Sequence, residues 1–263
     1  GKKMITYDFN LQTFEYFLLI LARISSFVYT APFFGMNNTP ARVKIGFSFV
    51  VSLLIYQVIS PKTGFVYAGV FSYATLVIQE VLCGLFIGFA ANVCTTIMLS
   101  AGKLIDMDVG LSMASEYDPM TKSESSVVSN FYNYIVMLLL MITYMHHYVL
   151  RAAIDSFTLI PLGKVIFKWD HLLKSMIQFM GDSFVIAFRI FLPVFAVILI
   201  MNCILGILSK VAPQMNMFSV GIQMKLLAGL FVMFLTVFLL PKVANYIFYE
   251  MKLLVQLFIE GMH

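Results

Sequence analysis

The side chains that could catalyse a reaction or bind a metal are few in this chain and widely spaced. The sequence contains no His-Glu-x-x-His zinc motif, no Gly-x-Ser-x-Gly nucleophile motif and no Gly-x-x-x-x-Gly-Lys-Ser/Thr phosphate loop. His146 and His147 are adjacent, so on a helix their side chains point about 100° apart and cannot share one metal ion. We interpret them as histidines at an interfacial helix end. The sequence therefore predicts no enzyme, no cofactor and no metal site.

Glu80 and Arg189 are the charged residues with the clearest functional potential, because each lies deep within an apolar run. An unpaired charge at the centre of a bilayer costs a few kcal/mol. The two side chains could pair with each other, pair with a partner subunit, or face water. An ion relay would indicate a secondary transporter, whereas a structural pair would hold an assembly together. One acid and one base are few for a relay, so the structural interpretation is favoured.

The composition indicates an integral membrane or membrane-complex protein. Of the 263 residues, 61% are hydrophobic and 11% are charged, whereas about a quarter of a soluble domain is charged. A chain of this size cannot bury so much apolar surface in its own core, so the remainder must contact lipid or partner proteins.

The net charge of +4 is small and no basic stripe carries stacking aromatics, so nucleic acid is not an expected partner. Glu15 and Arg23 interrupt the first apolar run, so no cleavable signal is expected.

Six apolar runs must position these residues, and they predict an all-α membrane-complex protein of about six long, kinked helices arranged in hairpins. The runs cover residues 11–30, 43–60, 65–100, 127–150, 172–209 and 218–258. A helix of about 35 residues reaches about 52 Å, against a hydrocarbon thickness of about 30 Å. The long helices are therefore expected to be kinked or to extend beyond the membrane. Pro193 and Pro241 are the expected kink points, since proline removes a backbone donor.

Two further features concern helix packing and topology. Gly84 and Gly88 form a Gly-x-x-x-Gly motif, which lets a second backbone approach closely.

The lysines and arginines of the connections fall almost evenly on the two sides of a six-crossing topology, although membrane proteins usually show a clear bias. This even distribution suggests that the helices do not cross a bilayer in the ordinary way.

A polar segment, residues 103–126, separates two of the apolar runs. Gly110 permits unusual backbone dihedrals, and the Asp118-Pro119 pair stops any helix. The small side chains at positions 112, 114 and 115 allow close packing and motion. Irregular backbone at membrane depth is tolerated only where protein buries it or where it lines a water-filled path. The ordinary alternative is an aqueous loop outside the membrane.

Three stretches of the sequence carry a family resemblance. They are GLSMASEYDP at 110–119, APFFGMNNTPARVKIGFSF at 31–49, and ILGILSKVAPQMNMFSVGIQMK at 204–225. Together they resemble the FliR family of flagellar type III export-gate proteins, whose injectisome relatives are called SctT. Together with the matching length and order of helices, the resemblance covers nearly the whole chain.

The resemblance implies a fusion of two smaller gate proteins. Residues 1–171 would be similar to FliP and would include a plug loop at 106–122, while residues 172–263 would be similar to the helical hairpin of FliQ. The implied partners are FliP, FliQ, FlhB, the basal-body ring, membrane lipid and unfolded export substrates. The implied location is the bacterial inner membrane, in the flagellar basal body, where the assembly would stand largely above the membrane plane.

The resemblance also implies roles for particular residues. The channel plug would be formed by Gly110, Leu111, Ser112, Met113, Ala114, Ser115, Glu116, Tyr117, Asp118 and Pro119. Subunit contacts and helix breaks would involve Pro40, Arg42, Pro213, Gln214, Asn216, Phe218 and Gly221. Met113 and Glu116 stand where some relatives carry Phe, which leaves the sealing side chain open. A secondary transporter that uses Glu80 and Arg189 is the alternative function, and a scaffold without a conduit is a third.

Overall fold

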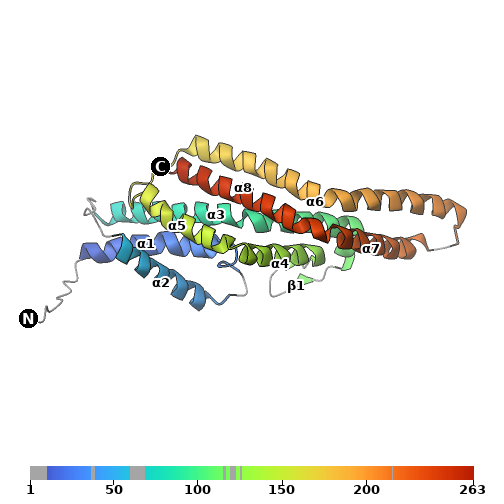
Figure 1. Cartoon of the computed structure of the whole chain (residues 1–263), viewed down its shortest axis with the longest axis horizontal. Coiled ribbons are helices and arrows are strands. Elements are labelled where there is room, and N and C mark those ends of the chain that lie inside the picture. Colours follow the sequence, from blue (N-terminus) through green and yellow to red (C-terminus); the bar gives the residue numbers. More distant parts are fainter. Residues whose placement is uncertain are drawn as a thin grey trace, which may run out of the picture. The chain divides into compact units, whose positions relative to one another are not determined.

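The computed structural model describes residues 11–36, 39–59, 69–114, 117–118, 123–124, 126–214 and 216–263. Within these residues it is helical apart from one very short strand pair (Figure 1). The α-helices are α1 (Leu11–Thr30), α2 (Ala41–Val58), α3 (Val70–Val109), α4 (Val127–Ile142), α5 (Met145–Leu159), α6 (Trp169–Val211), α7 (Met217–Thr236) and α8 (Leu240–Gly261). Two 3-10 helices, η1 (Leu111–Ala114) and η2 (Val237–Leu239), and an antiparallel pair, β1 (Tyr117–Asp118) with β2 (Ser123–Glu124), complete the list. The all-helical prediction is confirmed.

The prediction of about six helices is wrong, because two of the six apolar runs are broken. Within the 127–150 run, α4 ends at Ile142, and Thr143 is its C-cap residue. Tyr144 then takes a left-handed backbone with φ of 56° before α5 begins. The 218–258 run is interrupted by η2, which ends two residues before Pro241. Proline cannot donate a helical hydrogen bond and clashes with the preceding turn, so the 3-10 turn forms there. The α-helix is therefore interrupted in the turn before Pro241, the expected kink point, while Pro241 itself lies in the first turn of α8.

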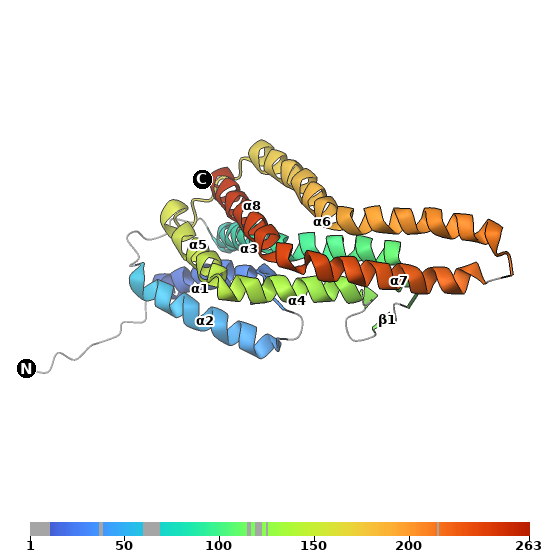
Figure 2. The same cartoon turned by 45° about the vertical axis from the view of Figure 1, so that its right-hand side comes forward.

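Helix α6 remains helical across Pro193 for its full 43 residues. Figure 2 shows a bend near the middle of α6, the part of the helix that contains Pro193. A proline inside a helix leaves one carbonyl without its donor and pushes the preceding turn away. The expected kink is thus accommodated by bending rather than by a break.

Four helical stretches among the described residues are long and apolar enough to cross a membrane. They are Ala41–Val58, Val70–Val109, Trp169–Val211 and Phe218–Gly261, and α4 with α5 makes a fifth if the interrupted pair counts as one span. Helix α1, which carries Glu15 and Arg23, is not among them. The 40 residues of α3 extend over about 60 Å, twice the thickness of a bilayer core.

The chain forms two compact units, and α3, α5, α6 and α8 contribute residues to both. The first unit comprises residues 1–92, 146–175 and 254–263, and the second comprises residues 93–145 and 176–253, each so far as it is described. This partition by compactness does not follow the 171/172 boundary that the family resemblance implies. The 171/172 boundary separates the parts that resemble two different proteins, and a division of the chain by compactness does not test that resemblance.

In the first unit, α1 lies side by side with α2 (Figure 1) and packs closely against α3. A Cβ added at Gly84 would overlap the carbonyl of Arg23 and the hydroxyl of Ser26. A Cβ added at Gly88 would overlap the Thr30 hydroxyl. The Gly-x-x-x-Gly motif therefore lets the backbones of α1 and α3 touch, as predicted.

Candidate functional site

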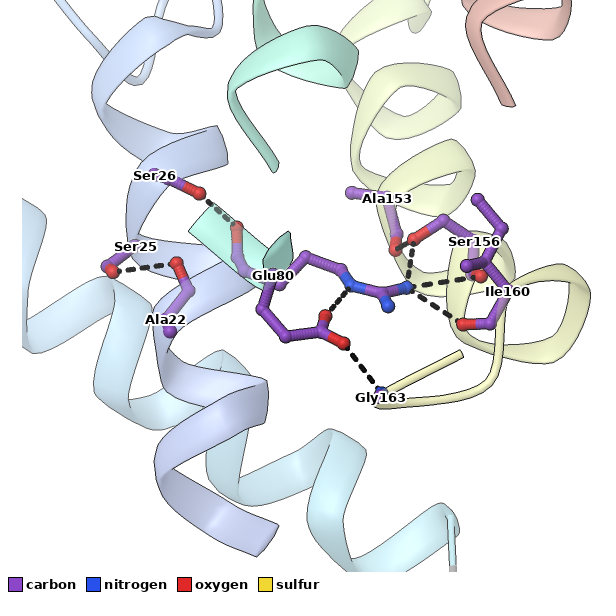
Figure 3. Close-up of polar contacts among 9 residues, drawn as sticks. Ala22, Ser25, Ser26, Glu80, Ala153, Ser156, Ile160 and Gly163 are labelled. Carbon is purple, nitrogen blue, oxygen red and sulfur yellow. Dashed lines mark hydrogen bonds and ion pairs between the residues drawn. The ribbon is translucent and has the colours of Figure 1, made fainter. Parts of the chain in front are cut away.

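A buried ion pair joins α1 and α3 in the first unit. The Nε of Arg23 donates to Oε2 of Glu80 over 2.6 Å, and the two side chains are 1% and 0% exposed. The second carboxylate oxygen, Oε1, accepts a hydrogen bond of 2.9 Å from the backbone N–H of Gly163 (Figure 3). Both oxygens of Glu80 are thus occupied by groups of the same chain.

The Arg23 guanidinium also binds the end of α5. Its Nη1 donates to the carbonyl of Ser156 at 3.2 Å and to that of Ile160 at 3.1 Å (Figure 3). The ring of Phe157 lies 4.3 Å from the Arg23 Cζ. A positive charge at a helix C-terminus is favourable because it faces the negative end of the helix dipole. The cluster therefore holds α1, α3, α5 and the connection that follows α5 in one arrangement.

Glu80 thus pairs with Arg23, which interrupts the first apolar run, and not with Arg189, the partner that the apolar runs suggest. Arg189 is exposed on α6. The available signal was an arginine in one apolar helix and a glutamate in another. The sequence alone did not indicate that α1 and α3 place these two residues at the same level.

Lys44 makes polar contacts at the turn between α1 and α2, whereas the contact of Arg42 with a partner subunit remains a prediction. Arg42 is exposed, whereas Lys44 is 7% exposed. The Lys44 Nζ donates to the carbonyl of Gly35 over 2.9 Å and lies 5.2 Å from the ring centroid of Tyr29. Pro40 precedes α2 as its N-cap residue with φ of −55°. Lys44 therefore ties the start of α2 to the turn, a role that sequence reasoning missed.

The predicted plug loop starts later than expected, because α3 continues through Val109. Residues 106–109 are thus helical, which corrects the 106–122 boundary. Gly110 ends the helix with φ of +92°, and nothing lies within 4 Å of where its Cβ would be. The backbone then forms η1, and β1 pairs with β2. Among the predicted plug residues, Ser112 is exposed, while Ser115, Glu116 and Pro119 lie outside the described residues.

The two ends of this segment meet at a buried carboxylate in the second unit. Asp106, on the last turns of α3, is 2% exposed. Its carboxylate accepts hydrogen bonds from the Ser126 hydroxyl and from the Val128 N–H, the latter at 3.1 and 3.3 Å from the two oxygens. The base of the segment is therefore built from ordered, buried groups.

The turn between α6 and α7 contains most of the remaining predicted contact residues. Pro213 and Gln214 are exposed, and Phe218 is 68% exposed. The Asn216 Oδ1 accepts from the Ser219 N–H at 3.4 Å, so Asn216 caps α7 within this chain. A Cβ at Gly221 would make only an ordinary contact with Leu205, at 3.4 Å. Any contact of these residues with a partner subunit remains a prediction.

Metal binding has little support in the part of the chain that the structure describes. No group of three His, Cys, Asp or Glu side chains there could hold a metal ion. The rings of His146 and His147 have centroids 4.1 Å apart. The polar groups brought together are the ion-pair cluster of Arg23 and the carboxylate of Asp106, both of which join helices.

Comparison with known proteins identifies the family. The sequence model described as bacterial export proteins, family 1, matches residues 14–251. The chain is 30% identical to the flagellar biosynthetic protein FliR of Bacillus subtilis (strain 168) over 215 residues, which cover 81% of this chain and 82% of the relative. It is 31% identical to the FliR protein of Pectobacterium carotovorum over 243 residues, 91% of this chain and 89% of the relative. The corresponding figures for Escherichia coli (strain K12) are 25% over 232 residues, 88% and 87%.

The chain therefore belongs to the family of bacterial export proteins, family 1, and is homologous to FliR proteins over most of its length. The resemblance found in its sequence is confirmed. It is an export-family protein with membrane-spanning candidate helices and is not an enzyme.

Proposed function

We propose that the chain is a core subunit of the flagellar type III protein export gate in the bacterial inner membrane. It assembles with FliP and FliQ, contacts FlhB, and forms with them the channel for unfolded flagellar subunits within the basal-body ring. The family match over residues 14–251 is the observation that carries this proposal.

The apolar surface of the chain supports an assembled state. Helices α6 and α7 expose large apolar side chains, including Phe184 at 65%, Phe231 at 59% and Phe234 at 67%. Such surfaces need lipid or partner subunits, since water is a poor solvent for them. Helices of 40 and 43 residues also exceed a bilayer core, which suits a complex that stands partly outside the membrane. In this proposal residues 1–171 take the place of a FliP subunit and residues 172–263 that of a FliQ hairpin.

Residues 110–119, within the 110–125 segment between α3 and α4, act in this proposal as a plug that closes the channel. The segment connects two apolar helices, α3 and α4, and Gly110 supplies a left-handed hinge with free space around it. The adjoining residues 111–116 are small or flexible, apart from Glu116, and would form a soft seal around varied polypeptide. Irregular backbone between such helices is consistent with a position along a water-filled path.

Deletion of residues 111–116 tests the plug. The deletion starts after Gly110 because Val109 is helical and 1% exposed, so removal of Val109 would damage α3 itself. We expect the assembled complex to form and to leak ions across the membrane at rest. Arg151→Ala on the exposed surface of α5 is the control and should leave the membrane tight. A deletion complex that assembles and leaks no more than the control would refute the plug.

The secondary-transporter alternative is weakened by the environment of Glu80. A relay residue must exchange ions, yet both Glu80 oxygens are bound by Arg23 and Gly163 in a buried cluster. A stable, substrate-binding monomer would favour the transporter, whereas a stoichiometric complex with an axial channel favours export.

A further inference from the structure

A polar cluster joins α3 to α4 at the base of the 110–125 segment. We call it the α3–α4 clamp, and it consists of Leu99, Asp106, Ser126, Val128 and Ser129. The Asp106 carboxylate accepts from the Ser126 hydroxyl and from the Val128 N–H. The Ser129 hydroxyl, also in the first turn of α4, donates over 2.9 Å to the Leu99 carbonyl, which lies seven residues before Asp106 on α3. The first turn of α4 is therefore held by two positions of α3 about two turns apart.

Asp106 performs the capping of α4 that Ser126 would ordinarily perform. Ser126 occupies the N-cap position with extended backbone angles, but its own side chain makes no capping hydrogen bond. The Val128 N–H, at the second helical position, is bound by the carboxylate of Asp106 instead. A negatively charged acceptor at a helix N-terminus stabilises the first turn through both the hydrogen bond and the helix dipole. The start of α4 thus depends on a residue of α3.

The helix backbones touch beside this carboxylate. A Cβ added at Gly102 would overlap the backbone of Ser129. Leu99, Gly102 and Asp106 are spaced by three and four residues, so they share one face of α3. Among the described residues no salt bridge reaches Asp106. Its burial is therefore compensated by hydrogen bonds from the first turn of α4.

The clamp ends where the packed part of α3 ends. Val109 is 1% exposed, and its Cγ2 lies 2.6 Å from where a Cβ of Gly229 on α7 would be. Gly110, the next residue, has nothing within 4 Å of its own Cβ position. The close packing of α3 against α7 therefore extends to Val109, and Gly110 is the first residue beyond it with open space at its Cβ position.

We propose that Asp106 is a positioning residue for the 110–125 segment. Its carboxylate clamps the end of α3 to the start of α4, so that the two helix ends that carry the segment keep a fixed separation. The consequence of this inference rests on the proposed function, because fixed helix ends confine any displacement of the plug to residues beyond Gly110. Without the carboxylate, the first turn of α4 frays and the segment gains a longer, looser base.

Amide hydrogen exchange in the assembled complex tests the clamp. In Asp106→Ala we expect the amides of residues 127–130 to exchange about two- to thirty-fold faster, the range that corresponds to loss of a helix N-cap. Lys103→Ala, an exposed position on the same helix, should leave this exchange unchanged. Unchanged exchange in an assembled Asp106→Ala complex would overturn the proposal.

Ser126→Ala keeps the test decisive if Asp106→Ala does not assemble. This variant removes the hydroxyl that donates to the carboxylate and also lies 2.6 Å from the Ser129 hydroxyl, but keeps the carboxylate that binds the Val128 N–H. It should accelerate the same amides by a smaller factor, and exchange at the wild-type rate would overturn the clamp.

Ion leakage of the same complexes separates the clamp from the plug. Faster exchange together with a larger leak supports both. Faster exchange without a larger leak supports the clamp and refutes the plug. Unchanged exchange overturns the clamp whatever the leak.

Discussion

Removal of Glu80 is expected to cost more free energy of unfolding than removal of the whole Arg23–Glu80 pair. In Glu80→Ala the Arg23 guanidinium would remain buried, at 1% exposure, without its counter-charge. Loss of one partner of a buried ion pair typically costs about 3–5 kcal/mol, because it leaves an uncompensated charge. The Gly163 N–H would also lose its acceptor. We therefore expect the upper part of this range.

The double variant Arg23→Met, Glu80→Leu removes both charges and fills similar volume. Replacement of a whole pair by apolar side chains is often close to neutral. Here it also leaves the Ser156 and Ile160 carbonyls without Arg23, so recovery should be incomplete. The double variant should therefore be less stable than wild type but more stable than Glu80→Ala.

The assay is equilibrium unfolding of the full chain in detergent micelles, followed by far-ultraviolet circular dichroism. Arg151→Ala is a matched control, since its partner Asp155 lies 3.7 Å away but both side chains are exposed. Exposed pairs contribute little, so this variant should be close to wild type. A Glu80→Ala protein within about 1 kcal/mol of wild type in free energy of unfolding would refute the interpretation that the Arg23–Glu80 cluster holds α1, α3 and α5 together. A double variant that is less stable than Glu80→Ala would refute the same interpretation.

Three further expectations concern single positions. Gly84→Ala should lower the free energy of unfolding in the same assay, because the added Cβ would overlap the α1 backbone. Gly46→Ala has open space and should be neutral or slightly stabilising. Equal changes in the free energy of unfolding would contradict the close approach of α1 and α3. Asn216→Ala should lower the stability of α7 by about 0.5–2 kcal/mol through loss of its N-cap, visible as faster exchange at the start of α7; wild-type exchange there would count against the cap. Gln214→Ala should reduce recovery of the assembled complex more than insertion of the chain into the membrane, and an equal reduction of both would argue against a partner contact.

Local chemistry made the helices and several of their ends predictable from the sequence. The first apolar run and α1 both cover residues 11–30, because a Pro-containing, Gly-containing turn follows directly. Pro241 predicts the interruption between α7 and α8. The break at Tyr144 was not predictable, since no Gly or Pro lies there and the left-handed backbone of this residue has no local signal.

The polar clusters were less predictable, because they depend on how helices align. Arg23 and Glu80 lie 57 positions apart, and only the packing of α1 on α3 brings them to 2.6 Å. The family resemblance places Asp106 in the plug loop, because the loop is mapped onto residues 106–122. In the structure, contact with α4 buries Asp106 and keeps it helical. Its capping role depends on a residue 22 positions later, so no short-range pattern reveals it.

A single-particle reconstruction of the complex that co-purifies with the tagged full chain would test the central claim most directly. The proposed function predicts one stoichiometric assembly with an axial channel and the 110–125 segment across its lumen. A chain that purifies alone, or a 110–125 segment that faces bulk solvent away from any lumen, would contradict the proposal.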